Sequence, residues 1–282
     1  MNARVGIFGC WIDRVRMPEA VARVYDLIER EDDVCHYVVT PNVDHVVMLD
    51  HHRGLQQAYA DASLILADGM PVVLASRLLR RGLPERITGT DLVGEMLAAA
   101  AGNGGLRVFL LGAGPGVAEQ AAERIASKWP AVDVVGTYSP PFGFEKDAEE
   151  NAHILQQIAD CRPDVLIVGL GAPKQELWVH QHRHEIEARV ALCVGAAIDF
   201  LAENKRRAPR WMQRAGLEWF HRMASEPKRL AGRYAHDAWQ FPRLVWRELK
   251  SPREIPAPTP LPNATESEPA WEEEPAVEGS QL

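Results

Sequence analysis

The sequence predicts an α/β fold of Rossmann-like type, in which helices cover both faces of a mainly parallel sheet. Short runs rich in Val, Ile and Leu alternate with longer stretches of helical periodicity along the first 204 residues. Near-continuous apolar strands separated by helices are typical of parallel sheets that are buried on both faces. With 282 residues, of which 46% are hydrophobic, the chain is long enough to bury a large core of this kind.

Six segments are predicted as strands, because each is short, rich in aliphatic residues and followed by a turn. They lie at 35–40, 63–67, 106–112, 132–136, 164–171 and 189–195. The segments between them are predicted to be helical, and residues 115–129, PGVAEQAAERIASKW, are an example. Because ligands of such sheets bind at the carboxyl ends of the strands, the residues that follow each strand are the first place to look for a site.

Polar or glycine-rich segments follow five of these strands. They are TPN (40–42), Asp68-Gly69, GAGPG (112–116), GAPKQE (171–176) and GAAID, which ends at Asp199. Five such segments at one edge of a sheet predict a binding site.

Each segment also has a simpler interpretation. Thr40 and Asn42 could cap the helix that begins near Val43, and Asp68 could cap the helix that begins at Met70. The turn at 112–116 resembles a dinucleotide fingerprint, but a complete G-x-G-x-x-G and an acid after the next strand are missing. An NAD-dependent dehydrogenase is therefore a weak alternative.

Charge is distributed unevenly along the chain, whose net charge is −8. Residues 205–250 hold 12 Lys and Arg against 4 Asp and Glu, a net charge of +8. Residues 251–282 hold 1 against 7, a net charge of −6, which leaves −10 for residues 1–204. We therefore expect an α/β domain over 1–204, a basic helical appendage over 205–250 and a disordered, acidic, Pro-rich tail over 251–282.

The basic appendage has two interpretations. It contains four of the eight tryptophans, and Arg222, Arg229 and Arg233 would share a face of a helix that Pro227 breaks or restarts. In one interpretation it is a solvated helix whose tryptophans pack on the body. In the other it contacts an anionic membrane surface. Nucleic acid would also fit a basic patch, but the acidic body and tail argue against it.

Seven blocks in order resemble the WecG/TagA/CpsF family of bacterial glycosyltransferases, glycosyltransferase family 26, over about residues 5–235. The blocks are TPN (40–42), ADGMPVV (67–73), ERITGTDL (85–92), VFLLGAGPGVAEQAA (108–122), PDVLIVGLGAPKQE (163–176), VGAAIDFLAENKRRAP (194–209) and LEWFHRMASEPKRLAGRY (217–234). One departure is visible, since the family often has Ala-Gly-Lys where this chain has Ala202-Glu203-Asn204. This departure affects the expected path of the chain where it enters the appendage.

The resemblance implies transfer of a sugar from a UDP-sugar to a sugar carried on an undecaprenyl diphosphate lipid, with inversion at the anomeric carbon. The donor sugar would be of the N-acetylmannosamine or the glucose type. An inverting transfer needs a base for the acceptor hydroxyl, and Asp68 at a strand end is our candidate. The resemblance places Thr40 and Asn42 in the same pocket, and it implies that Arg86 contacts acceptor phosphate or the reacting centre.

Further residues are predicted to bind substrate. Gln175 and the glycine-rich turns would hold the UDP-sugar, because bare backbone lets phosphate and ribose come close. The resemblance and the strand ends together give this set: Gly69, Gly112, Gly114, Gly171, Pro173, Gln175, Glu176, Asp199, Arg222, Arg229 and Arg233.

No metal ion and no cofactor are expected. The sequence contains no Asp-x-Asp, and HRHE (182–185) is interpreted as a solvated helix face rather than a ligand set. The arginines of the appendage are the better candidates for neutralising the departing UDP, since guanidinium groups bind phosphates bidentately.

The expected location is the cytoplasm, peripheral on the inner face of the cytoplasmic membrane. The N-terminus lacks the pattern of a signal peptide. No apolar run is close to the length of about 18 residues that a membrane span needs. The expected partners are the UDP-sugar, the lipid-linked acceptor and the membrane surface, with a homo-oligomer left open. The alternative function is a catalytically idle nucleotide-binding protein on the same fold.

Overall fold

The protein is built on a six-stranded parallel sheet with strand order β4-β3-β8-β7-β5-β6. The computed structural model describes residues 4–31, 33–204, 207–214, 216, 218–225, 227–251 and 255, with the side chains of Arg210, Arg214, Arg222 and Arg229 outside that description. The strands are β3 (His36–Val39), β4 (Leu64–Ile65), β5 (Leu106–Gly112), β6 (Val132–Tyr138), β7 (Val165–Gly169) and β8 (Val190–Cys193). All six predicted strands are confirmed.

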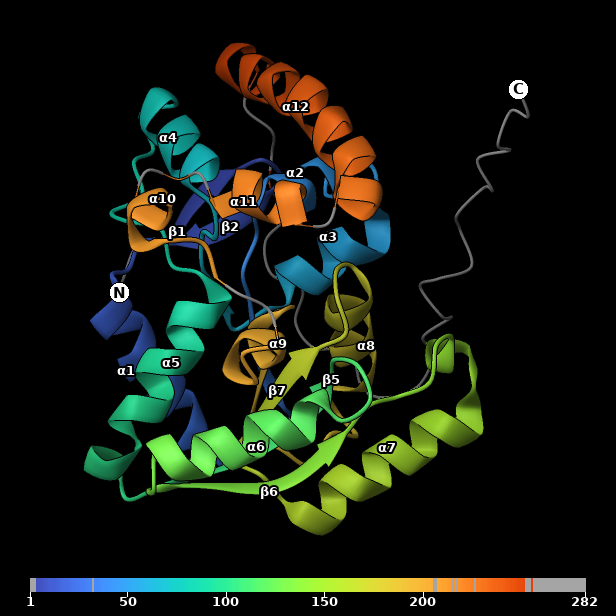
Figure 1. The fold of residues 1–282 in the computed structure, drawn as a ribbon. Coiled ribbons are helices and arrows are strands. Elements are labelled where there is room, and N and C mark those ends of the chain that lie inside the picture. The colour runs from blue at the N-terminus through green and yellow to red at the C-terminus, as the bar shows by residue number, and fades with distance from the viewer. Residues whose placement is uncertain are drawn as a thin grey trace.

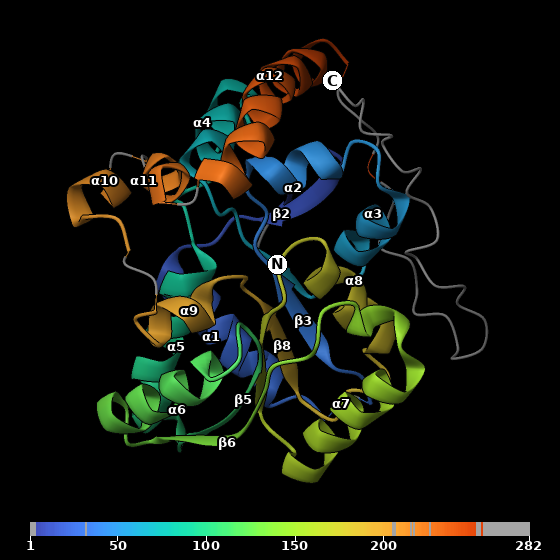
Figure 2. The same ribbon diagram turned by 45° about the vertical axis from the view of Figure 1, so that its right-hand side comes forward.

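Helices cover both faces of the sheet, as predicted (Figures 1 and 2). One face is packed by α1 (Met17–Ile28), α5 (Gly89–Ala99), α6 (Val117–Lys128) and α9 (Ala197–Leu201). The other is packed by α2 (Val43–Met48), α3 (Arg53–Ala60), α7 (Ala148–Cys161) and α8 (Lys174–His182). Alternate residues of one strand enter the two cores: Val108 and Leu110 of β5 join the first, and Phe109 and Leu111 join the second.

A β-hairpin that the sequence analysis did not predict precedes this sheet. It consists of β1 (Arg4–Ile7) and β2 (Cys10–Asp13), which pair antiparallel. Asp13, at the end of β2, receives side-chain hydrogen bonds from Arg4 at 3.2 Å and Arg23 at 2.7 Å. It also accepts the backbone N–H of Ile65 at 3.0 Å. One buried carboxylate thus fastens the hairpin to α1 and to the edge strand β4.

The carboxyl ends of the central strands approach one another closely. A Cβ atom on Gly112, at the end of β5, would lie 2.6 Å from the carbonyl carbon and oxygen of Gly169, at the end of β7. A Cβ atom on Gly169 would in turn lie 2.9 Å from the carbonyl oxygen of Gly195, which follows β8. Glycine is needed at these ends because the backbones pack without side chains between them.

The interpretation of residues 182–185 as a solvated helix face is wrong for two of the four residues. His182 and Arg183, at the end of α8, are buried. The ring of His182 packs against Trp178 with centroids 5.2 Å apart, and Arg183 lies 3.5 Å from the buried carboxylate of Asp61. The helix is buried between α3 and the sheet, which the polar composition of its end does not reveal.

Three helices form the appendage: α10 (Arg210–Arg214), α11 (Glu218–Ser225) and α12 (Pro227–Lys250). The helix restarts at Pro227, as expected. The long helix α12 lies against α2 and beside α4 (Met70–Leu78) at one end of the molecule (Figures 1 and 2). Two contacts attach α12 to the body. The ring of Phe241 packs against that of Phe8 with centroids 5.5 Å apart, and Glu248 forms an ion pair with Arg81 at 2.9 Å.

Two sequence-based expectations concern the end of the chain and membrane spans. The tail predicted over 251–282 lies outside the described residues except for Ser251 and Ile255. Among the helices of the described residues, none has the length and apolar character that crossing a bilayer requires.

Candidate active site

A cavity of about 340 Å³ lies between the ends of β3 and β4 and the helices of the appendage. Five of the predicted site residues line it: Asn42, Asp68, Gly69, Arg86 and Arg233. The appendage also contributes Glu218, Trp219, Tyr234, Asp237 and Phe241 to its wall. The sheet order explains why Asn42 and Asp68 lie on the same cavity. Strands β3 and β4 are parallel neighbours, so the residues that follow them leave the sheet side by side.

Asp68 lies on this cavity and not at the cap of the helix that follows it. The N-cap position of α4 is occupied by Gly69, whose φ of 144° is in the region that favours glycine. The backbone N–H of Asp68 donates to the carbonyl of Pro41 at 2.8 Å, which ties the ends of β3 and β4 together. The structure thus disfavours the capping interpretation of Asp68, which lines the cavity.

Arg86 is held by a cluster of charges that joins the body to the appendage. Its Nη1 donates to Oε2 of Glu218 on α11 at 3.1 Å, and Nε of Arg207 donates to the other oxygen of Glu218 at 3.0 Å. Arg207 also makes two bonds to Asp91 on α5, at 2.5 and 2.9 Å. Burial acts to raise the pKa of Asp91, but hydrogen bonds from Arg207 and Thr88 outweigh it and hold the pKa below its ordinary value.

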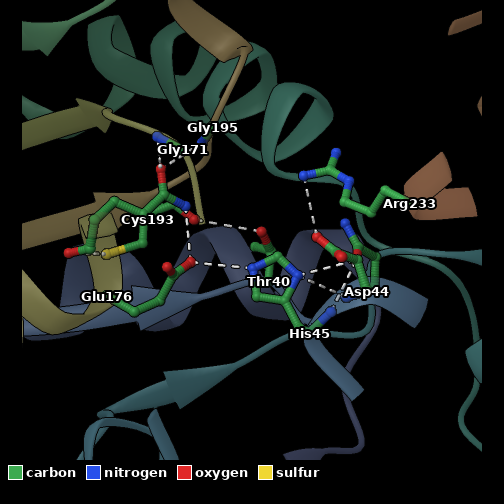
Figure 3. A network of polar contacts seen from close by, with 10 residues as sticks. Thr40, Asp44, His45, Gly171, Glu176, Cys193, Gly195 and Arg233 are labelled. Atoms are coloured by element: carbon green, nitrogen blue, oxygen red, sulfur yellow. Dashed lines mark hydrogen bonds and ion pairs between the residues drawn. The ribbon is translucent and has the colours of Figure 1, made fainter. Parts of the chain in front are cut away.

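Asn42 caps α2, so the capping interpretation is correct for this residue. Its Oδ1 accepts the backbone N–H of His45 at 3.3 Å and lies 2.9 Å from Nδ1 of the same histidine. The other ring nitrogen of His45, Nε2, lies 3.2 Å from the carboxylate of Glu176 on α8. Figure 3 shows Glu176 and His45 within this network of polar contacts.

Thr40 and Gln175 connect the strand ends behind the cavity. The hydroxyl of Thr40 donates to the carbonyl of Cys193, the last residue of β8, at 3.3 Å (Figure 3). Gln175 is buried, and its Oε1 accepts the backbone N–H groups of Gly171 at 3.3 Å and Gly195 at 3.1 Å. Neither side chain is among those that line the 340 Å³ cavity. Thr40 holds the end of β3, from which Asn42 reaches the cavity, and Gln175 holds the loops that follow β7 and β8.

The remaining predicted residues follow other strands of the same sheet. Gly112 and Gly114 belong to the turn between β5 and α6, where Ser139 Oγ donates to both carbonyls at 3.1 and 3.4 Å. Asp199 lies in the first turn of α9 and accepts a hydrogen bond from Asn204 at 3.3 Å. Gly171 and Pro173 precede α8. Like Glu176 on α8 itself, these residues do not line the 340 Å³ cavity, and their roles stay predictions.

The site thus combines a carboxylate with guanidinium groups and aromatic walls at the carboxyl edge of the sheet. Comparison with known proteins shows which family the chain belongs to. Residues 5–255 match the model of the glycosyl transferase WecG/TagA/CpsF family. The chain belongs to this family. It is therefore a glycosyltransferase.

Relatives within the WecG/TagA/CpsF family have a common name. The chain is 31% identical to the N-acetylglucosaminyldiphosphoundecaprenol N-acetyl-β-D-mannosaminyltransferase of Staphylococcus aureus (strain MRSA252) over 229 residues, 81% of this chain and 87% of the relative. It is 34% identical to the protein of the same name from Bacillus subtilis (strain 168) over 191 residues, 68% of this chain and 71% of the relative.

Several residues of this glycosyltransferase site are absent from the sequence-based set. Asp44 and Asp237 line the cavity, and Arg233 lies 3.4 Å from Asp44. Burial, and second the charge of Asp44, raise the pKa of Asp237 to about 6. No sequence signal marks Asp237, which is one acid within a long helix. The side chains of Arg222 and Arg229 lie outside the described residues, so their predicted roles stay predictions.

The charge cluster at Arg86 predicts how firmly the appendage of this glycosyltransferase is attached. Replacing Glu218 with Ala should leave Arg86 and Arg207 without their shared carboxylate and loosen α11. Residues in one network couple by about 1–2 kcal/mol, so we expect amide hydrogen exchange in α11 to accelerate roughly 5- to 30-fold. The matched control is Glu95→Ala, an exposed acid on α5 outside the cluster. Equal exchange rates in both variants would contradict a stabilising role for the cluster.

Proposed function

We propose that this glycosyltransferase moves an N-acetylmannosamine-type sugar from UDP to an undecaprenyl-diphosphate-linked N-acetylglucosamine, with inversion at the anomeric carbon. The acceptor and the sugar are those in the names of the relatives from Staphylococcus aureus and Bacillus subtilis. The observation that carries the proposal is the position of Asp68, on a cavity that also holds Arg86 and Arg233. A glucose-type donor is the runner-up, and a catalytically idle nucleotide-binding protein is the second candidate.

Asp68 is proposed as the general base. Its carboxylate takes the proton of the acceptor hydroxyl while that oxygen attacks the anomeric carbon. The bond from this carbon to the UDP oxygen breaks at the same time, so the electron pair leaves with UDP. A carboxylate at a strand end suits this role, because the backbone around it is fixed by the hydrogen bond from Asp68 N–H to Pro41.

Guanidinium groups are proposed to compensate the charge of the departing diphosphate. Arg86 and Arg233 both line the cavity, and both are paired with carboxylates, Glu218 and Asp44. A bound diphosphate offers the same guanidinium groups an alternative anionic partner, so binding need not create a new charged site. The transfer is therefore proposed to need neither metal nor cofactor.

A membrane-facing role is proposed for the outer face of α12. Trp239 and Trp246 are 63% and 61% exposed, so these two tryptophans do not pack on the body. Arg243 stacks on Trp239 at 3.7 Å and Lys250 on Trp246 at 4.8 Å. Alternating aromatic and cationic side chains along one helix face suit the interface of an anionic bilayer. We therefore propose that the protein is peripheral on the cytoplasmic membrane surface, with 1–204 as the catalytic domain and 205–250 as the membrane-associating appendage.

The proposed activity is tested with a panel of UDP-sugars and a short-chain prenyl-diphosphate N-acetylglucosamine acceptor. UDP release and a disaccharide product are expected with UDP-N-acetylmannosamine, and they should persist in excess EDTA because guanidinium groups stabilise the departing UDP. Binding of UDP-sugars without turnover of any of them would favour the idle nucleotide-binding alternative. Activity that EDTA abolishes and Mg²⁺ or Mn²⁺ restores would contradict metal independence.

The role of Asp68 is tested by Asp68→Asn, which keeps the shape of the side chain but removes the base. Turnover should fall about 10²- to 10⁴-fold, the range for loss of general acid–base catalysis, while donor binding is kept. The control is Asp26→Asn, an exposed acid on α1 far along the chain from the site. A variant at position 68 with near-normal turnover would exclude Asp68 as the base.

The membrane role of α12 is tested by replacing Trp239 and Trp246 with Ser. Each tryptophan offers about 150–250 Å² for burial, so we expect binding to anionic vesicles to weaken at least about tenfold. Trp129→Ser is the control away from α12: Lys128 stacks on that ring at 4.4 Å at the end of α6, and because Trp129 also packs on the core, the folding of this variant is checked first. Removal of the tail after residue 251 should change little. Undiminished vesicle sedimentation of the double variant would refute this part of the proposal.

A further inference from the structure

The backbone of α2 determines which way the Asn42 amide faces. Its oxygen accepts the N–H of His45, and only an oxygen can do this because a backbone N–H is a donor. The amide NH₂ group of Asn42 must therefore point the other way. Asn42 lines the cavity. A Cβ atom built on Gly69 would lie 3.7 Å from the Cβ atom of Asn42, so Asn42 lies beside Asp68-Gly69.

His45 has a hydrogen-bond acceptor on both sides of its ring. Nδ1 lies 2.9 Å from the capping oxygen of Asn42 and 3.5 Å from the backbone nitrogen of the same residue, and Nε2 lies 3.2 Å from Oε1 of Glu176. The shorter contact of Nδ1 is with the acceptor oxygen, and the backbone N–H of Asn42 is at the far limit of hydrogen-bond distance. A neutral imidazole carries one N–H and satisfies one of these acceptors, whereas an imidazolium carries two and satisfies both. The geometry therefore fits the charged form of His45.

The charges around His45 favour the same form. Glu176 is fully buried, and a buried carboxylate is strongly unfavourable without a compensating charge. Burial lowers the pKa of His45, but the hydrogen bond and charge of Glu176, with Asp44 and Asp68, more than offset this, so the pKa lies above its ordinary value.

The other titratable neighbours do not oppose this charge. The ring of Tyr59 on α3 lies 6.3 Å from that of His45, and burial raises its pKa, so the phenol is neutral. Among the described residues of α12, Arg233 is the cation near the His45 network, and it is paired with Asp44 (Figure 3). The imidazolium therefore faces two acidic neighbours and its own counter-ion, Glu176.

We propose that His45 is a positioning residue for sugar transfer: held by Glu176, it locks Asn42 so that the amide NH₂ donates to an oxygen of the bound substrate. The proposal rests on the proposed function, since it takes the cavity as the substrate site. His45 is buried and does not line the cavity, so it acts through Asn42. When Nδ1 of His45 loses its proton, Oδ1 of Asn42 keeps the backbone N–H of His45 at 3.3 Å but loses the shorter hydrogen bond from the ring, so the amide is held less firmly.

The proposal predicts a difference between two substitutions of similar size. His45→Asn places an amide nitrogen near the position of Nδ1 and keeps a donor towards Asn42, whereas His45→Gln places it near Nε2, towards Glu176. We expect His45→Asn to retain about 5- to 30-fold more kcat/KM than His45→Gln, the factor that corresponds to one hydrogen bond to a buried partner. His51→Asn, at an exposed histidine after α2, is the control and should behave as wild type.

A pH profile separates positioning from a merely structural role. In the wild type, kcat/KM should fall at alkaline pH as His45 loses its proton. Glu176→Gln removes the counter-ion, and this limb should move down by about one to three pH units. In His45→Asn the limb should be absent. A variant that is folded by circular dichroism and keeps the wild-type limb would overturn the proposal.

The protonation state is read independently of turnover by ¹⁵N NMR of the imidazole in wild type and Glu176→Gln. Two protonated ring nitrogens at pH 7 in wild type, with earlier loss of one proton in Glu176→Gln, are expected. A neutral His45 at pH 7 in wild type would overturn the proposal even if transfer is observed. If the wild type shows a charged His45 but transfers no sugar to any acceptor, the proposed function fails instead.

Discussion

The ion cluster of Arg86, Glu218, Arg207 and Asp91 is the contact on which the assembled site depends. Two guanidinium groups and two carboxylates meet at the junction of α5, the chain leading into the appendage, and α11. Their charges balance, and the side chains of Arg86 and Glu218 are only 14% and 16% exposed, so solvent screens the pair less than a surface ion pair. Arg86 lines the cavity and is bonded to Glu218 of the appendage. The same ion pair therefore attaches the appendage and orients a side chain of the site.

The sheet supplies the other half of the site by bringing strand ends together. Gly112 and Gly169 allow the ends of β5 and β7 to touch, and Gln175 ties the loops after β7 and β8 through two backbone N–H groups. The loops that follow these central strands are therefore held together at the same edge of the sheet as the cavity. A site built this way is organised before the reaction, which favours interactions made with charge that develops in the transition state.

The body of the fold was predictable because apolar runs and their polar ends report burial directly. The same reasoning singled out Asp68, because ligands of parallel sheets bind at the carboxyl ends of the strands, and Asp68 lines the cavity there. It failed for the hairpin, whose strands are four residues each, and for His182, whose polarity conceals its packing on Trp178. The appendage wall was out of reach for a different reason: helical spacing tells which residues share a face, but not what that face packs against. Asp237 could not be placed without knowing that α12 lies on α2.

The helix α12 carries two faces with different surroundings. Arg233, Tyr234 and Asp237 form part of the cavity wall, whereas Trp239, Arg243, Trp246 and Lys250 point away from it towards solvent. A single helix cannot rotate or tilt on one side alone. A displacement of α12 at its outer face would therefore also move Arg233, Tyr234 and Asp237 in the cavity wall.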